Sequence, residues 1–175
     1  MADCINALKE WTGKASATVV YDSTVDEFTH NGLFEKVKGK RNIAIIATTT
    51  DGDVFGAYYS VAVTQQEQYF QDPDMFIFSF ESHGRCMTPQ RFMVKEEWKG
   101  GASVEFFKNV CGGRFVLFNG GGGWFSLGNE KSRTWCFQLS HGFNGIDDTT
   151  LTGEPEGSHS GNFTCCRLVA VQLSH

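Results

Sequence analysis

The clearest strand pattern in the chain lies in residues 42–63, NIAIIATTTDGDVFGAYYSVAV. Its first eight residues form a nearly continuous apolar run, which is typical of a strand buried on both faces. Asp51-Gly52 then supplies a strong signal for a hairpin turn. From residue 54 the apolar side chains alternate, with Phe55, Ala57 and Tyr59 on one face. We therefore predict an antiparallel β-hairpin here.

Strand signals continue on both sides of this hairpin. We predict further strands at 17–21, 75–80, 90–95, 103–108, 114–118, 124–128, 133–139 and 163–173. In 75–80, Phe76, Phe78 and Phe80 project to one side, which we predict faces the core. Glycine-rich turns separate the strands at intervals typical of an all-β sandwich or barrel. The predicted fold class is mainly β (α+β): a two-sheet antiparallel β-sandwich with a few short flanking helices.

Two helical segments accompany these strands. Residues 4–11 place apolar side chains at roughly helical spacing, which predicts a short helix. A second helix is predicted after residue 22, with Ser23 as the cap and Asp26 in the capping-box position. Asn31-Gly32 is expected to interrupt it. Its buried stripe would consist of Phe28, Leu33, Phe34 and Val37.

Composition restricts the classes of partner. The 175 residues carry 15 Lys plus Arg against 20 Asp plus Glu, a formal net charge of −5. Nucleic-acid binders carry a basic patch or stripe, and the sequence shows none, so we expect no nucleic-acid partner. No apolar run approaches the about 18 residues of a membrane span, and residues 1–30 resemble neither a secretory nor a transit signal. We expect a cytoplasmic protein without membrane insertion, and the oligomeric state stays open.

The sequence contains no recognisable catalytic constellation. The run Gly120–Gly123 leads into a strand pattern, whereas a P-loop needs Gly-Lys-Ser/Thr opening a helix. The five His have no metal-ligand spacing, and the Gly-x-Ser-x-Gly elbow of serine hydrolases is missing. We therefore predict no catalytic residues, no metal site and no cofactor.

The six cysteines, at 4, 86, 111, 136, 165 and 166, contain no Cys-x-x-Cys pair. In a reducing compartment most are expected to be buried thiols. Cys165 and Cys166 are adjacent, so in a strand they face opposite sides of the sheet. Cys86 is the best candidate for a redox-reactive thiol, because the neighbouring His83 and Arg85 could favour a thiolate.

Segment 81–91 is the densest in chemical groups and is our candidate interaction or redox loop. Its candidate residues are Glu81, His83, Arg85, Cys86 and Arg91. Functional residues favour loops on rigid scaffolds. The alternative is a polar connection whose Arg residues pair with local acids. A second candidate is the acidic pair Asp147 and Asp148, which is either a weak cation site or a solvated loop.

Several of these segments resemble the TLDc family in order and spacing. Residues 50–60 are similar to a family stretch in which an Asp-Gly turn leads into Phe-Gly-Gly-Tyr, with Ala57 in place of the second Gly. Residues 72–80, DPDMFIFSF, resemble the next family strand. The chain departs from the family at 170–173, AVQL, where Glu-Val-Trp is usual. We expect residues 1–14 to be an N-terminal extension with a short helix, and residues 15–175 to form the TLDc-like domain.

The resemblance implies a β-sandwich without agreed catalytic residues and a role in protection against oxidative stress. In several family members it also implies binding of the vacuolar-type proton ATPase (V-ATPase). Our leading hypothesis is a non-enzymatic interaction module with a protein partner. Two alternatives stay open: a redox protein that reacts through Cys86, and a small-molecule or glycan-binding sandwich that stacks its ligand on Trp98 or Trp124.

Overall fold

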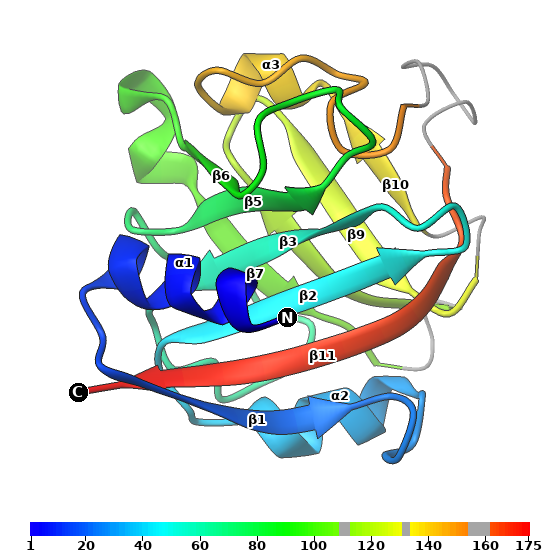
Figure 1. Ribbon diagram of the computed structural model, residues 1–175. Helices are drawn as coiled ribbons and strands as arrows, with labels where there is room; N and C mark the ends of the chain where they lie inside the picture. The colour runs from blue at the N-terminus through cyan, green and yellow to red at the C-terminus, as the bar shows by residue number, and fades with distance from the viewer. Residues whose placement is uncertain (109–112, 131–133, 154–161) are drawn as a thin grey trace.

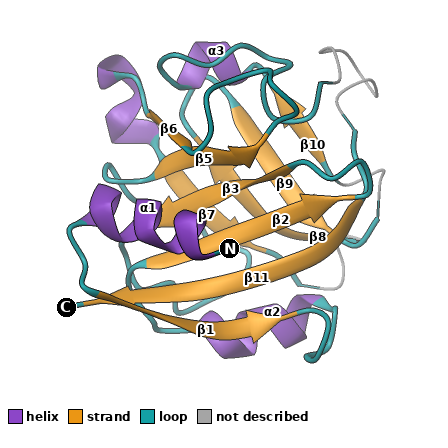
Figure 2. Ribbon diagram, viewed as in Figure 1, coloured by secondary structure: helices purple, strands orange, loops and turns teal. Residues whose placement is uncertain are grey.

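Two antiparallel sheets face each other, with short helices at their margins (Figure 1, Figure 2). The computed structural model describes residues 1–108, 113–130, 134–153 and 162–175. The helices are α1 (Ala2–Thr12), α2 (His30–Val37), α3 (Leu139–Gly142) and the 3-10 helix η1 (Glu96–Gly101). The predicted fold class, a mainly β two-sheet architecture with a few short helices, is confirmed.

The first sheet has six strands in the order β1-β11-β2-β3-β5-β6. They are β1 (Ser16–Asp22), β11 (Cys165–Ser174), β2 (Ile43–Thr49), β3 (Val54–Tyr59), β5 (Phe76–Glu81) and β6 (Gln90–Met93). The predicted hairpin is β2–β3, with Ile43 opposite Tyr59 and Thr48 opposite Val54. Strand β11 lies between β1 and β2, so segments from the two ends of the sequence share one sheet (Figure 1).

The second sheet has five strands in the order β10-β9-β8-β7-β4. They are β10 (Trp135–Phe137), β9 (Trp124–Gly128), β8 (Arg114–Asn119), β7 (Ser103–Phe106) and β4 (Phe70–Gln71). The run Gly120–Gly123 forms the turn of the β8–β9 hairpin, where the Gly120 N–H donates to the Gly123 carbonyl at 2.7 Å. The sequence around β4 has no strand pattern. Its two residues are extended because they pair with β7, a contact that a local pattern does not reveal.

Helix α2 begins later than the sequence predicts. Its cap is Thr29, whose side chain accepts a hydrogen bond from the Gly32 N–H at 3.0 Å. Ser23 is not the cap, since its hydroxyl accepts a hydrogen bond from strand β11. Asn31-Gly32 lies inside the first turn and does not interrupt the helix, because Thr29 satisfies the free N–H of that turn. Three members of the predicted stripe, Leu33, Phe34 and Val37, are buried in the helix.

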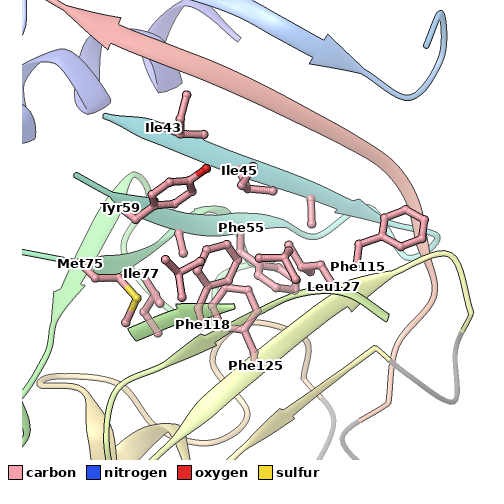
Figure 3. Close-up of a cluster of buried hydrophobic side chains, with 14 of the residues drawn as sticks. Ile43, Ile45, Phe55, Tyr59, Met75, Ile77, Phe115, Phe118, Phe125 and Leu127 are labelled. Carbon is pink, nitrogen blue, oxygen red and sulfur yellow. The ribbon is translucent and has the colours of Figure 1, made fainter. Parts of the chain in front are cut away.

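The larger apolar cluster fills the space between the sheets (Figure 3). Phe55 of the first sheet meets Phe125 of the second with ring centroids 5.7 Å apart, and Phe118 lies 5.2 Å from Phe125. Both contacts fall in the distance range of favourable aromatic pairs. The abundance of Phe in the sequence therefore serves an aromatic inter-sheet core.

A second apolar cluster lies on the outer face of the first sheet, beneath α1 (Figure 1). The three Phe of β5 are buried on one side of the strand, as predicted, but the core they enter is this outer cluster and not the one between the sheets. Phe76, Phe78 and Phe80 belong to this outer cluster, whereas Ile77 of the same strand enters the inter-sheet core. Trp11 of α1 lies 6.0, 6.2 and 6.1 Å from the three Phe rings. Helix α1 therefore shields the apolar side chains on the outer face of the first sheet from water.

No helix in the described part of the chain is long and apolar enough to span a membrane.

Candidate functional site

A buried carboxylate stands where the β2–β3 turn ends. The Asp53 side chain is 2% exposed, and its Oδ1 accepts a hydrogen bond from Arg85 Nη2 at 2.6 Å. The Nδ1 atom of His83 lies 2.8 Å from the same oxygen. A buried carboxylate needs such partners, because its desolvation is costly. The turn pattern Asp51-Gly52-Asp53 thus ends in an anchor for segment 81–91.

Arg85 extends this anchor to a third segment. Its Nε donates to the Thr150 carbonyl at 3.0 Å, and its Nη2 donates to the Leu151 carbonyl at 2.9 Å. The guanidinium therefore joins the β2–β3 turn, the loop after β5 and the segment before β11. Two of the candidate loop residues, His83 and Arg85, are brought together, and the contacts that Arg85 makes are those of a structural clamp.

The acidic pair organises its own loop. Asp147 Oδ1 accepts hydrogen bonds from the N–H and the hydroxyl of Thr149, both at 2.7 Å, and these bonds hold the pKa of Asp147 below its usual range. Asp148 Oδ1 accepts a hydrogen bond at 2.9 Å from the N–H of Ser140, which lies in α3. Within the described ranges, no group of three or more His, Cys, Asp or Glu side chains could hold a metal ion.

Cys86 makes hydrogen bonds with Ser82 of the same loop. Its Sγ lies 3.3 Å from Ser82 Oγ, and the side chain packs partly against the inter-sheet core. His83 and Arg85, which the sequence places beside it, are turned to Asp53. The contacts of Cys86 are therefore with Ser82 and the inter-sheet core, and its role as a redox-reactive thiol stays a prediction.

The adjacent cysteines of β11 face opposite sides of the sheet, as predicted. Cys165 is buried, and burial raises its pKa to about 12. Cys166 faces the opposite side and is exposed. Cys111 lies outside the described residues.

Arg91, the last candidate of segment 81–91, takes part in a different set of contacts. It lies in β6, and its Nη1 donates to the Trp11 carbonyl at 2.9 Å. The guanidinium carbon is 5.7 Å from the centroid of the Phe76 ring. Arg91 therefore belongs to the α1-covered face of the first sheet, whereas Glu81 caps its own loop by accepting the His83 N–H at 2.7 Å.

A cluster of aromatic side chains covers part of the second sheet. Of these side chains, the sequence analysis singled out only Trp124. We use the term aromatic surface for Trp124, Trp135, Phe137 and Arg114. The Trp124 ring lies 5.5 Å from both Trp135 and Phe137. The Arg114 guanidinium carbon is 5.8 Å from the Trp124 centroid and 5.3 Å from that of Trp135. Phe137 is 41% exposed.

Strand pairing assembles this surface. Phe137 of β10 stands opposite Trp124 of β9, and Trp135 opposite Ser126. Between them Cys136 points inward and is buried. The alternation Trp-Cys-Phe at 135–137 is the signal that could have identified the outward side chains. Trp98, the other predicted stacking residue, is 41% exposed and lies close to Gly121 instead.

A family model for the TLDc domain matches residues 2–98. The match covers 97 of the 175 residues, from 98 − 2 + 1. The chain belongs to the TLDc family. No curated protein matches it.

The matched part of this TLDc chain includes α1, the β2–β3 hairpin and the Asp53–Arg85 pair. The aromatic surface lies in the part of the chain beyond the match. The division between an extension at 1–14 and a domain from 15 stays a prediction.

Proposed function

We propose that this TLDc chain is a non-enzymatic module that binds a protein partner through the aromatic surface. The observation that carries the proposal is the cluster of two Trp, one Phe and one Arg on the outer side of a sheet. Trp and Arg dominate the residues that carry most binding energy at protein interfaces. Aromatic residues and Arg are also enriched there relative to the rest of the surface.

The rigidity of the surface supports the same proposal. Its rings stand on paired strands and pack on one another, so few rotamers are lost when a partner binds. Arg114 is held over the Trp124 and Trp135 rings by cation–π contacts, which orient its guanidinium before binding.

Family membership suggests the partner and the biological role. We propose that the partner is a subunit of the V-ATPase and that the complex contributes to protection against oxidative stress. Fold and family do not by themselves determine function. The two steps, binding by the aromatic surface and identity of the partner, therefore need separate tests.

The first test measures binding of the purified chain to the isolated V-ATPase by surface plasmon resonance. Phe137→Ala should weaken the complex at least about tenfold, which corresponds to about 1.4 kcal/mol. Val19→Ala is the matched control, because Val19 is an apolar strand residue, 57% exposed, in the other sheet. Equal affinities of Phe137→Ala and the wild type would remove the aromatic surface from the proposal. Absence of any complex with the wild type would remove the V-ATPase as partner.

A further inference from the structure

The chain contains three Asn-Gly pairs, a dipeptide with a chemistry of its own. They are Asn31-Gly32, Asn119-Gly120 and Asn144-Gly145. In such a pair the backbone nitrogen of Gly can attack the side-chain carbonyl carbon of Asn, because Gly neither hinders the approach nor restricts the backbone. The attack needs a Gly N–H without a partner, an Asn side chain that is not held, and a backbone that can rotate. These requirements distinguish the three pairs in the folded chain.

The first pair is held in the first turn of helix α2. The Gly32 N–H donates a hydrogen bond to Thr29 Oγ1 at 3.0 Å. The backbone here is also closely packed, since a Cβ on Gly32 would clash with the Glu27 carbonyl oxygen. The Gly32 nitrogen can therefore attack Asn31 only after this end of α2 opens.

The second pair is held at the turn between β8 and β9. The Gly120 N–H donates to the Gly123 carbonyl at 2.7 Å, and Asn119 Oδ1 accepts the Gly121 N–H at 2.8 Å. A Cβ on Gly120 would clash with the Phe143 ring, so this backbone has little room to rotate. Both reacting groups of the second pair are engaged, and they too must be freed before they react.

The third pair stands open in the turn that follows α3. Asn144 and Gly145 are both exposed. Among the described residues, neither the Asn144 side chain nor the Gly145 N–H has a hydrogen-bond partner. Gly145 has a φ of 76°, and no atom lies within 4 Å of the position of a Cβ. The third pair alone meets all three requirements in the described part of the chain.

We propose that Asn144 is a modification site, at which the folded chain deamidates spontaneously while Asn31 and Asn119 are protected. The Gly145 nitrogen forms a bond to Asn144 Cγ as its proton passes to a base in the solvent. The bond from Cγ to the side-chain nitrogen breaks, and this nitrogen takes up a proton and leaves as ammonia. Water then opens the succinimide ring to give aspartate or isoaspartate, so the net reaction consumes water and releases ammonia.

The isoaspartate product changes the backbone at a sensitive place. It routes the main chain through the former side chain, which adds a carbon atom between two residues anchored in the inter-sheet core. These anchors are Phe143 and Ile146, which are 1% and 7% exposed. Aspartate adds only a negative charge at an exposed position. Isoaspartate should therefore destabilise the fold, and aspartate should not.

The proposal is tested by incubating the full chain in warm, mildly alkaline buffer and mapping its peptides by mass spectrometry. Asn119 is the matched control, because Phe118-Asn119-Gly120 and Phe143-Asn144-Gly145 have the same sequence. In the native chain Asn144 should deamidate at least about tenfold faster than Asn119, whose hydrogen bonds must first break. In concentrated urea the two rates should be equal. A native Asn119 or Asn31 as fast as Asn144, or a preference for Asn144 that persists in urea, would overturn the proposal.

Variants and a second readout test the product. An isoaspartyl methyltransferase, which transfers a methyl group from S-adenosylmethionine to the free carboxylate of isoaspartate, should methylate the aged wild type. It should not methylate aged Asn144→Gln, because the longer side chain closes a ring much more slowly. Equal methylation of both chains would contradict the assignment of the site.

The effect on the fold is measured by urea unfolding of the isoaspartyl chain, separated by ion exchange. Asn144→Asp is its control, because this variant carries the same charge on an ordinary backbone. The isoaspartyl chain should unfold at a lower urea concentration than Asn144→Asp. Equal midpoints would refute the inferred strain between Phe143 and Ile146.

Discussion

Replacing Asp53 by Asn tests whether one buried carboxylate holds three segments together. Asn keeps the shape of the side chain and one acceptor oxygen, but it removes the charge that Arg85 and His83 share at 2.6 and 2.8 Å. Arg85 would keep its bonds to the Thr150 and Leu151 carbonyls while losing its counter-charge. We therefore expect a loss of stability without a change of fold.

The magnitude follows from burial. Breaking a fully buried ion pair costs about 3–5 kcal/mol. Here the Asp53 side chain is 2% exposed, but the side chains of Arg85 and His83 are 26% and 52% exposed. Water can therefore solvate these two partners when the carboxylate is removed, which reduces the cost. We expect Asp53→Asn to lower the free energy of unfolding by about 2 kcal/mol. For a chain of this size, that change lowers the Tm by about 4–8 °C.

Urea unfolding followed by tryptophan fluorescence measures this difference directly. Asp51→Asn is the matched control, because it removes an exposed carboxylate from the same turn, and it should change stability by less than about 0.5 kcal/mol. Arg85→Gln and the double variant complete a cycle, in which the coupling between the two sites should exceed about 1 kcal/mol. If Asp53→Asn costs no more stability than Asp51→Asn, or if the effects of Asp53→Asn and Arg85→Gln are additive, then Asp53 does not hold the three segments together through Arg85.

Three further predictions concern other parts of the molecule. Trp11→Ala should lower the free energy of unfolding by about 2–3 kcal/mol, because α1 loses its contact with the aromatic outer face; an unchanged urea midpoint would contradict this packing. Hydrogen bonds from Arg167 hold the pKa of Asp22 well below its usual range, so this pair contributes stability above about pH 4 that is lost as the pH falls further. Asp22→Asn should accordingly show a shallower fall in the free energy of unfolding between about pH 5 and pH 2, and equal slopes would count against the pair. In alkylation followed by mass spectrometry, the exposed Cys166 should react before the buried Cys136 and Cys165, whose pKa values are raised by burial; a faster Cys165 would show that β11 does not lie as described.

Candidate functional residues were predictable in part. The density of charged groups in 81–91 identified a segment with real structural importance, since Arg85 reaches residues 32 and 65 positions away in the sequence. It did not reveal that Arg91 belongs to another face. Nor did it reveal the aromatic surface, because only the pairing of β9 with β10 brings Trp124 and Phe137 together.

The local structure of the central hairpin follows from the sequence alone. The apolar run at 42–49, the Asp51-Gly52 turn and the alternation after it define the β2–β3 hairpin, since strand period and turn chemistry depend on neighbouring residues. Long-range packing, by contrast, sets which face of β5 lies between the two sheets. Strand alternation puts Phe76, Phe78 and Phe80 on one side of β5. Helix α1 covers that side, and the second sheet covers the other side. Both faces are therefore apolar, and a local pattern cannot distinguish between two apolar environments that distant segments supply.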